Sequence, residues 1–205
     1  KKNIIVINIG GISNFTFLNG KKTFFASDIG PGNTLIDEFC YKNFNKSFDV
    51  NGNLAKKGKI KFELIDLWLN NKIFLENFPK SFDTQDFNFI NSISYKTHSA
   101  YDILRTLTFF SAKLISMIKM SINFKIDSWV FSGGGVNNSL LMSDIKNLLI
   151  NDKLLISNSL GFDSSFVESA AFAYISIRTL KKLPSAYPNT TGCSKKNICG
   201  SVYIP

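Results

Sequence analysis

The chain has 205 residues, of which 44% are hydrophobic, and its formal net charge is +9. This length and composition predict a globular protein with a substantial core, as one large domain or two small ones. No run of eighteen apolar residues occurs, and the basic start at residues 1–11 (KKNIIVINIGG) lacks the pattern of a cleaved signal peptide. The sequence therefore predicts neither a membrane span nor a membrane partner, and it favours the cytoplasm.

The positive charge is spread along the chain, and lysines cluster only at residues 55–61 (AKKGKIK) and 180–183 (LKKL). Nucleic-acid binding needs a concentrated basic surface, so we expect a solvated face and no nucleic-acid partner. An acidic or phosphorylated partner is the alternative. Cys40, Cys193 and Cys199 are an odd number with no metal-ligand spacing, so we expect free thiols and no metal site.

The first part of the chain has strand patterns. The β-branched run Asn3–Ile9 predicts a buried strand, residues 13–19 (SNFTFLN) alternate, and a turn signal at Asn19 and Gly20 precedes a returning strand at residues 21–28. The spacing then changes to that of a helix in residues 30–44, where Pro31 lies near the start. Three adjacent strands followed by a helix are predicted.

The remaining chain alternates helices and strands after a weaker polar stretch at residues 45–99. The expected elements are helices at 61–71, 100–122, 137–150 and 164–183, strands at 127–133 and 153–158, and a final strand at 201–205 after an irregular tail. This order predicts an α/β fold with a mixed sheet and helices on its faces. The strands at 3–9 and 127–131 are expected to be neighbours.

Glycine-rich turns follow two predicted strands, at Gly10 and Gly11 and at Gly133, Gly134 and Gly135. Ligands bind beyond strand ends in such sheets, and glycine lets the backbone approach a phosphate or a base. The triple glycine favours ligand contact, whereas the first pair is equally compatible with a simple turn. Since parallel neighbours end together, both turns are expected at one cleft, with a nucleotide as the ligand.

A third loop, GPGN at residues 30–33, opens the first helix and adds Gly30, Gly32 and Asn33 as cleft candidates. Asp28 precedes this loop and is expected to orient it or to cap the helix, with a ligand contact as the alternative. Asp37, like its neighbour Glu38, is expected to be a surface acid.

Several stretches together carry a family resemblance. They are NIGGISN (8–14), DIGPGNTLID (28–37), FPKSFD (78–83), YDILRTLTFFSA (101–112), VFSGGGVNN (130–138), VESAAFAY (167–174) and TTGC (190–193). This succession resembles the second half of the anhydro-N-acetylmuramic acid kinases, members of the actin-like ATPase and sugar kinase superfamily. The resemblance implies an RNase H-like, actin-like ATPase domain over residues 1–205, with a helical insertion at about 45–125.

The resemblance also implies an activity that uses ATP and Mg²⁺ in peptidoglycan recycling. Such an enzyme opens the 1,6-anhydro ring of anhydro-N-acetylmuramate with water and phosphorylates the 6-oxygen. Gly10, Gly11 and Asn14 would belong to a phosphate-contacting turn, and the triple glycine to the nucleotide-contacting turn. Glu168 would face the cleft as a ligand or metal-water contact, although a first-turn helix acid is also explained by the helix dipole.

The sequence departs from the family in two ways. The family's N-terminal domain, with a GTSMDG-type phosphate turn and the aspartate base, is absent from these residues, so no catalytic residue is expected here. After FPKS the family continues Thr-Gly-Arg, whereas Phe82, Asp83 and Thr84 follow in this chain. Two hypotheses stay open: the nucleotide-binding half of a sugar kinase that needs its missing half, or a non-catalytic domain that binds a nucleotide or a partner protein. A homodimer is a further open alternative.

Overall fold

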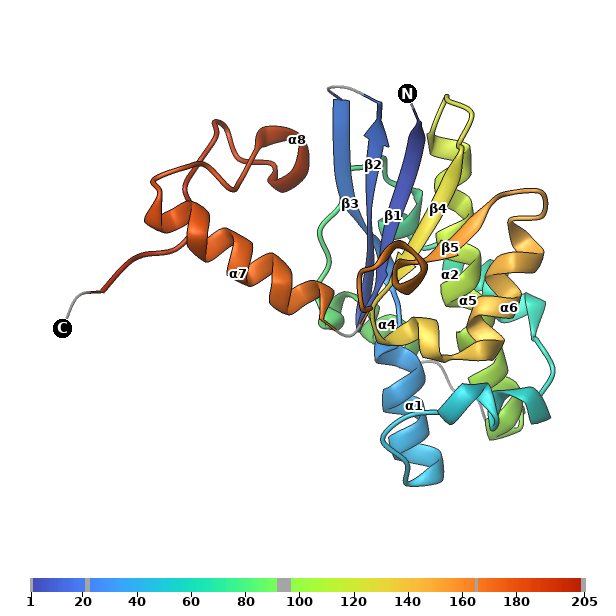
Figure 1. The fold of residues 1–205 in the computed structure, drawn as a ribbon. Helices are drawn as coiled ribbons and strands as arrows, with labels where there is room; N and C mark the ends of the chain where they lie inside the picture. The colour runs from blue at the N-terminus through green and yellow to red at the C-terminus, as the bar shows by residue number, and fades with distance from the viewer. Residues whose placement is uncertain (1, 21–22, 92–96, 165, 204–205) are drawn as a thin grey trace.

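The computed structural model describes residues 2–20, 23–91, 97–164 and 166–203, and its centre is one mixed sheet (Figure 1). Five strands lie in the order β3-β2-β1-β4-β5. Their bounds are β1 (Asn3–Ile9), β2 (Ile12–Asn19), β3 (Thr23–Pro31), β4 (Ser128–Ser132) and β5 (Leu154–Ile156). The predicted strand at 21–28 begins outside the described residues, and its described part lies in β3. The predicted α/β fold with a mixed sheet is confirmed.

The sheet has an antiparallel half and a parallel half. β1 pairs with β2 antiparallel, with Ile7 opposite Phe15, and β2 pairs with β3 in the same sense. β1 also pairs with β4 in parallel, with Val6 beside Val130, and β5 extends this parallel side. The expected neighbourhood of the first and fourth strands is therefore confirmed, and both strands end at the same edge of the sheet.

Helices fill the connections. Their bounds are α1 (Thr34–Phe44), α2 (Phe62–Leu69), α3 (Lys72–Leu75), α4 (Asn88–Asn91), α5 (Ala100–Ser121), α6 (Ser139–Leu148), α7 (Val167–Leu180) and α8 (Pro188–Thr191). Figure 1 shows α2, α5 and α6 on one side of the sheet, and α1 beyond the end where β1 and β4 finish. The predicted helices at 61–71, 100–122, 137–150 and 164–183 correspond to α2, α5, α6 and α7.

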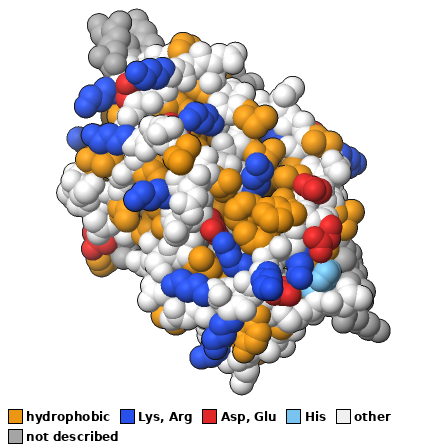
Figure 2. All heavy atoms as spheres, turned by 90° about the vertical axis from the view of Figure 1, so that its right-hand side faces the viewer, with side chains coloured by type: hydrophobic (Ala, Val, Ile, Leu, Met, Phe, Trp, Pro, Cys, Tyr) orange, Lys and Arg blue, Asp and Glu red, His pale blue; other side chains and the backbone are white. Residues whose placement is uncertain are grey.

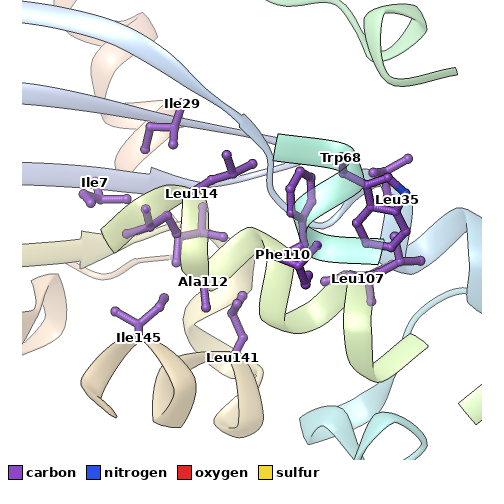
Figure 3. Packing of buried hydrophobic residues seen from close by; sticks show 14 of the residues in the cluster. Ile7, Ile29, Leu35, Trp68, Leu107, Phe110, Ala112, Leu114, Leu141 and Ile145 are labelled. Atoms are coloured by element: carbon purple, nitrogen blue, oxygen red, sulfur yellow. The ribbon is translucent and has the colours of Figure 1, made fainter. Parts of the chain in front are cut away.

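The core lies between one face of the sheet and α5. Alternate residues of the central strands are buried: Ile5, Ile7, Ile9, Phe15, Phe17, Trp129 and Phe131. From α5, Phe110 contacts Trp68 of α2 edge to face, with ring centroids 5.2 Å apart, while Leu141 and Ile145 of α6 are fully buried. Figure 3 shows part of this cluster, with Ile7, Trp68, Phe110, Leu141 and Ile145 among its labelled residues. The apolar residues that alternate along the strands and those that repeat at helical spacing in α5 are therefore buried in the same cluster.

α5 and α6 are also joined by an ion pair. The guanidinium nitrogens of Arg105 donate to both carboxylate oxygens of Asp144, at 2.5 and 2.8 Å. Their side chains are only 13% and 8% exposed. This two-pronged contact fixes α6 against α5 and, through α6, the loop that precedes it.

The C-terminal region has a different character. α7 has no buried residue, and Figure 1 shows it running away from the sheet. The tail is held locally by a bridge between Ala186 and Asn197 and by the Arg178 side chain, which donates to the Pro184 carbonyl. Residues 201–203 are irregular, so the expected final strand is wrong for its described part; residues 204–205 lie outside the description. This segment lies near α7 and away from the sheet, so it has no strand to pair with (Figure 1).

The surface shows mixed polarity. On the face in Figure 2, lysine and arginine side chains lie scattered among hydrophobic and neutral polar atoms. Within the described residues, no helix has both the length and the apolarity needed to cross a bilayer.

Candidate functional site

The turn after β1 is bonded to the start of α1. The amides of Gly32 and Thr34 donate to the Gly11 carbonyl at 2.8 and 3.1 Å, and the Asn33 amide donates to the Gly10 carbonyl at 2.9 Å. A Cβ on Gly32 would lie 2.4 Å from the Gly10 oxygen. The GPGN loop therefore needs its second glycine to approach the Gly10–Gly11 turn, and its amides are already engaged there.

The three glycines after β4 have two different environments. Gly133 has φ +84°, and a Cβ there would lie 2.5 Å from Asn8 Oδ1. A Cβ on Gly135 would lie 2.2 Å from Cγ2 of Ile9, whereas one on Gly134 would have no atom within 4 Å. Gly133 and Gly135 thus allow close contact with β1, and Gly134 alone faces open space.

Gly134 opens onto a cavity of about 380 Å³, called here the Gly134 cavity. Apolar walls come from Ile36 of α1 and from Phe48 and Val50 of the segment after it. Asn33, Asp37 and Asn137 add polar groups. Gly10 and Gly11 do not line this cavity, but the Asn33 amide is bonded to Gly10 at its edge. A cavity of this size that combines apolar walls with polar side chains is typical of a small-molecule site.

Asp37 is half-buried in this cavity wall, so the prediction that it is a surface acid is wrong. Burial raises the pKa of its carboxyl to about 6. Among the described residues its side chain has no hydrogen bond or ion pair. The missed signal was spacing, because Asn33 and Asp37 are one helical turn apart and therefore share a face.

A second cavity, of about 400 Å³, lies on the other side of β2 and β3. Asn14 and Asp28 line it together with Thr190 and Thr191 of α8. Strand alternation explains this placement, because Phe15 points into the core and Asn14 therefore points to the opposite face. The structure thus separates Asn14 from the Gly134 cavity.

Asp28 holds a different loop from the one expected. Its Oδ2 accepts a hydrogen bond from the Phe82 amide at 2.8 Å, and its own amide donates to the Lys80 carbonyl at 3.0 Å. The N-cap of α1 is Asn33, without a side-chain cap bond. The expectation that Asp28 caps the helix is wrong, because its side chain and its amide are bonded to the FPKSFD segment beside β3.

Two further candidates lie apart from the Gly134 cavity. Gly30 packs on the core, where a Cβ would lie 2.8 Å from Leu114 Cδ1 and 3.2 Å from Phe74 Cε1. Glu168 is exposed in the first turn of α7 and lines neither of the cavities just described. Within the described ranges, no group of three or more histidine, cysteine, aspartate or glutamate residues could hold a metal ion.

Comparison with known proteins decides the family. The family model described as "Anhydro-N-acetylmuramic acid kinase" matches residues 1–205. The chain belongs to the anhydro-N-acetylmuramic acid kinase family. A curated member of that name from Rhodopseudomonas palustris is 36% identical over 187 residues, which cover 91% of this chain and 50% of that protein. One from Bacillus cereus is 34% identical over 216 residues, covering all of this chain and 55% of the relative.

The chain therefore spans about half the length of the curated anhydro-N-acetylmuramic acid kinases that it matches. Among solved structures, the xylulose kinase from Rhodospirillum rubrum superposes with a TM-score of 0.49 at 11% identity. That superposition covers 76% of this chain and 35% of the xylulose kinase. The family model and the curated relatives confirm the resemblance noted in the sequence.

Proposed function

We propose that this chain is the nucleotide-binding half of an ATP-dependent kinase that acts on anhydro-N-acetylmuramate. The complete enzyme would hydrolyse the 1,6-anhydro bond and phosphorylate the 6-oxygen in peptidoglycan recycling. Residues 1–205 would form its C-terminal ATPase-type domain, with the helices between α1 and β4 as an insertion. The matching relatives are named anhydro-N-acetylmuramic acid kinases, which supports the substrate and the reaction class.

The observation that carries the proposal is the open position of Gly134 on its cavity. An adenine ring is flat and has apolar faces, so it would pack between the backbone at Gly134 and the side chains of Ile36, Phe48 and Val50. Side chains at Gly134 would fill that space. The size of the cavity, about 380 Å³, is in the range of small-molecule sites.

The phosphates would extend from this cavity toward the Gly10–Gly11 turn. That turn ends β1, which is the parallel neighbour of β4, so both glycine turns lie at the same sheet edge. Gly11 is exposed, and the Thr34 hydroxyl lies 2.8 Å from the position of a Cβ on it. A backbone without side chains can approach phosphate oxygens there.

Mg²⁺ would be held mainly by phosphate oxygens and water, as is usual for this ion in kinases. When bound, it neutralises the charge that develops on the transferred phosphoryl group. The chain's own part is to bind and orient the nucleotide. Glu168 is exposed at the start of α7. We assign its carboxylate as a candidate contact to a metal-bound water in the complete enzyme, where both halves form the cleft.

We propose that this chain acts together with an N-terminal half, which corresponds to the part of the relatives that the chain does not cover. That half would supply the general base. The test combines the purified chain with the N-terminal half of the Bacillus cereus relative, ATP, Mg²⁺ and anhydro-N-acetylmuramate. Mass spectrometry should detect N-acetylmuramate 6-phosphate in the mixture and none with either half alone. Product from this chain alone would contradict the assignment of the base, and ATP binding without product in the mixture would favour the non-catalytic alternative.

A further inference from the structure

Asp37 is a half-buried carboxylate on the wall of the Gly134 cavity, and no described side chain or backbone group compensates it. Removing a carboxylate from water is unfavourable unless hydrogen bonds or a cation replace the lost hydration. Here burial alone raises the pKa of Asp37. A carboxylate that lines a cavity without a hydrogen-bond donor or cation beside it is typical of a binding site in which the ligand supplies that donor.

Two neighbouring acceptors, Asp49 and Asn138, are already engaged in the fold. Both oxygens of Asp49 accept hydrogen bonds, from the amides of Leu54 and Ala55 at 2.8 and 2.9 Å. Asn138 Oδ1 accepts from the Leu141 amide at 3.1 Å, and so caps α6. These two acceptors hold the cavity walls in place, whereas Asp37 lines the cavity and has no hydrogen bond or ion pair to a described side chain.

The position of Asp37 along α1 indicates which part of a nucleotide it would meet. Asn33 starts α1, is bonded to Gly10 through its amide and lies at the phosphate end of the proposed site. Gly134, where we place the base, lines the same cavity as Asn33 and Asp37. Asp37 comes one helical turn after Asn33, and in a nucleotide the ribose lies between the phosphates and the base.

Building on the proposed function, we propose that Asp37 determines specificity by accepting hydrogen bonds from the ribose hydroxyls of the nucleotide in the Gly134 cavity. An ionised carboxylate only accepts hydrogen bonds, and its two oxygens match the two adjacent O–H donors of a ribose. Hydrogen bonds to a charged acceptor are stronger than neutral ones. A deoxynucleotide would leave Asp37 partly unsatisfied, so the site would select ribonucleotides.

The test measures binding of ATP and 2′-deoxy-ATP to the whole chain by isothermal titration calorimetry. We expect the native chain to prefer ATP by about tenfold, and Asp37→Ala to bind both nucleotides with similar, weaker affinity. Glu38→Ala is the matched control, because Glu38 is the next residue, lies outside the cavity and forms an exposed ion pair with Lys42. That variant should keep both the affinity and the preference. Circular dichroism would verify that each variant is folded.

The outcomes separate the two proposals. A native chain that binds neither nucleotide would overturn both the proposed function and the role of Asp37. ATP binding with the same ribose preference in Asp37→Ala would overturn only the role of Asp37. If Asp37→Ala kept that preference but lost discrimination between ATP and inosine triphosphate, the carboxylate would recognise the base amino group, and the ribose assignment would be wrong.

Discussion

Gly135 and Ile9 lie so close that a Cβ on Gly135 would be 2.2 Å from Cγ2 of Ile9. This contact joins the loop after β4 to the last residue of β1, and Ile9 is fully buried. It explains why the chain has glycine there without reference to a ligand. The neighbouring Gly134 has no such contact, so these two adjacent glycines have different roles.

Substituting Gly135 should therefore affect folding, and substituting Gly134 should not. We expect Gly135→Ala to lower the free energy of unfolding by about 1–3 kcal/mol, because the new methyl group overlaps Ile9 in a packed core. Gly134→Ala is the matched control and should change it by less than about 0.5 kcal/mol. Urea unfolding measures both. Equal losses in the two variants would show that the loop adapts freely and that the contact with Ile9 is not restrictive.

The ion pair between α5 and α6 gives a second stability prediction. Arg105→Ala leaves Asp144 as an unpaired charge that is only 8% exposed, and should lower the free energy of unfolding by about 3 kcal/mol. The double variant Arg105→Met with Asp144→Leu removes both charges and should recover most of that loss. A double variant as unstable as Arg105→Ala would indicate that the pair contributes through its packing and not through its charge balance.

Sequence periodicity was sufficient to predict the order of the main strands and helices. Alternating apolar residues such as Ile5, Ile7 and Ile9 indicate directly which face of a strand is buried. The expectation that β1 and β4 are neighbours, which followed from the predicted mixed α/β sheet, is also confirmed. The roles of Gly133 and Gly135 could not be predicted, because their contacts with Asn8 and Ile9 join segments more than a hundred residues apart along the chain.

The side-chain environments of the candidate site were less predictable. Asp37 was expected to be a surface acid because it lies one turn into the helix, yet the segment after α1 folds back and forms a cavity wall beside it. Asp28 was expected to serve the helix that follows it in the sequence. It instead bonds the Phe82 amide, because the FPKSFD segment runs along β3.

Because Asp37 is half-buried, its contribution to the free energy of unfolding should decrease as pH rises. Its folded pKa, about 6, lies above the ordinary value of 3.8, so the folded state binds this proton more tightly than the unfolded state does. The contribution of this group to stability is therefore largest below about pH 4, falls as pH rises to about 6, and is constant above.

Asp37→Asn should remove this dependence. Allowing for solvent screening at a half-buried group, the variant should be more stable than the native chain by about 1 kcal/mol at about pH 7.5, and equally stable near pH 4. Chemical unfolding of both proteins at the two pH values gives the difference. A variant that is less stable at neutral pH would mean that the Asp37 carboxylate has a stabilising partner in the folded chain.

The Asp28 contact predicts a local effect on the FPKSFD segment. Asp28→Ala removes the acceptor of the Phe82 amide, so we expect faster hydrogen exchange at Phe82 and a loss of about 1–2 kcal/mol in the free energy of unfolding. Asp83→Ala, in the next turn, is a suitable comparison because it should leave the Phe82 amide protected. Unchanged exchange at Phe82 in Asp28→Ala would contradict the role given to this hydrogen bond.

The central claim is that a nucleotide binds against the backbone at Gly134, and ATP titration of the whole chain by calorimetry tests it most directly. Gly134→Val places branched carbons in the cavity, so ATP affinity should fall by at least about tenfold, or about 1.4 kcal/mol, with little change in the free energy of unfolding. Ala170→Val, at an exposed position of α7, adds the same branching outside both cavities and should leave ATP affinity unchanged. If Gly134→Val and Ala170→Val bind ATP as the native chain does, the nucleotide does not occupy this cavity and the account is wrong.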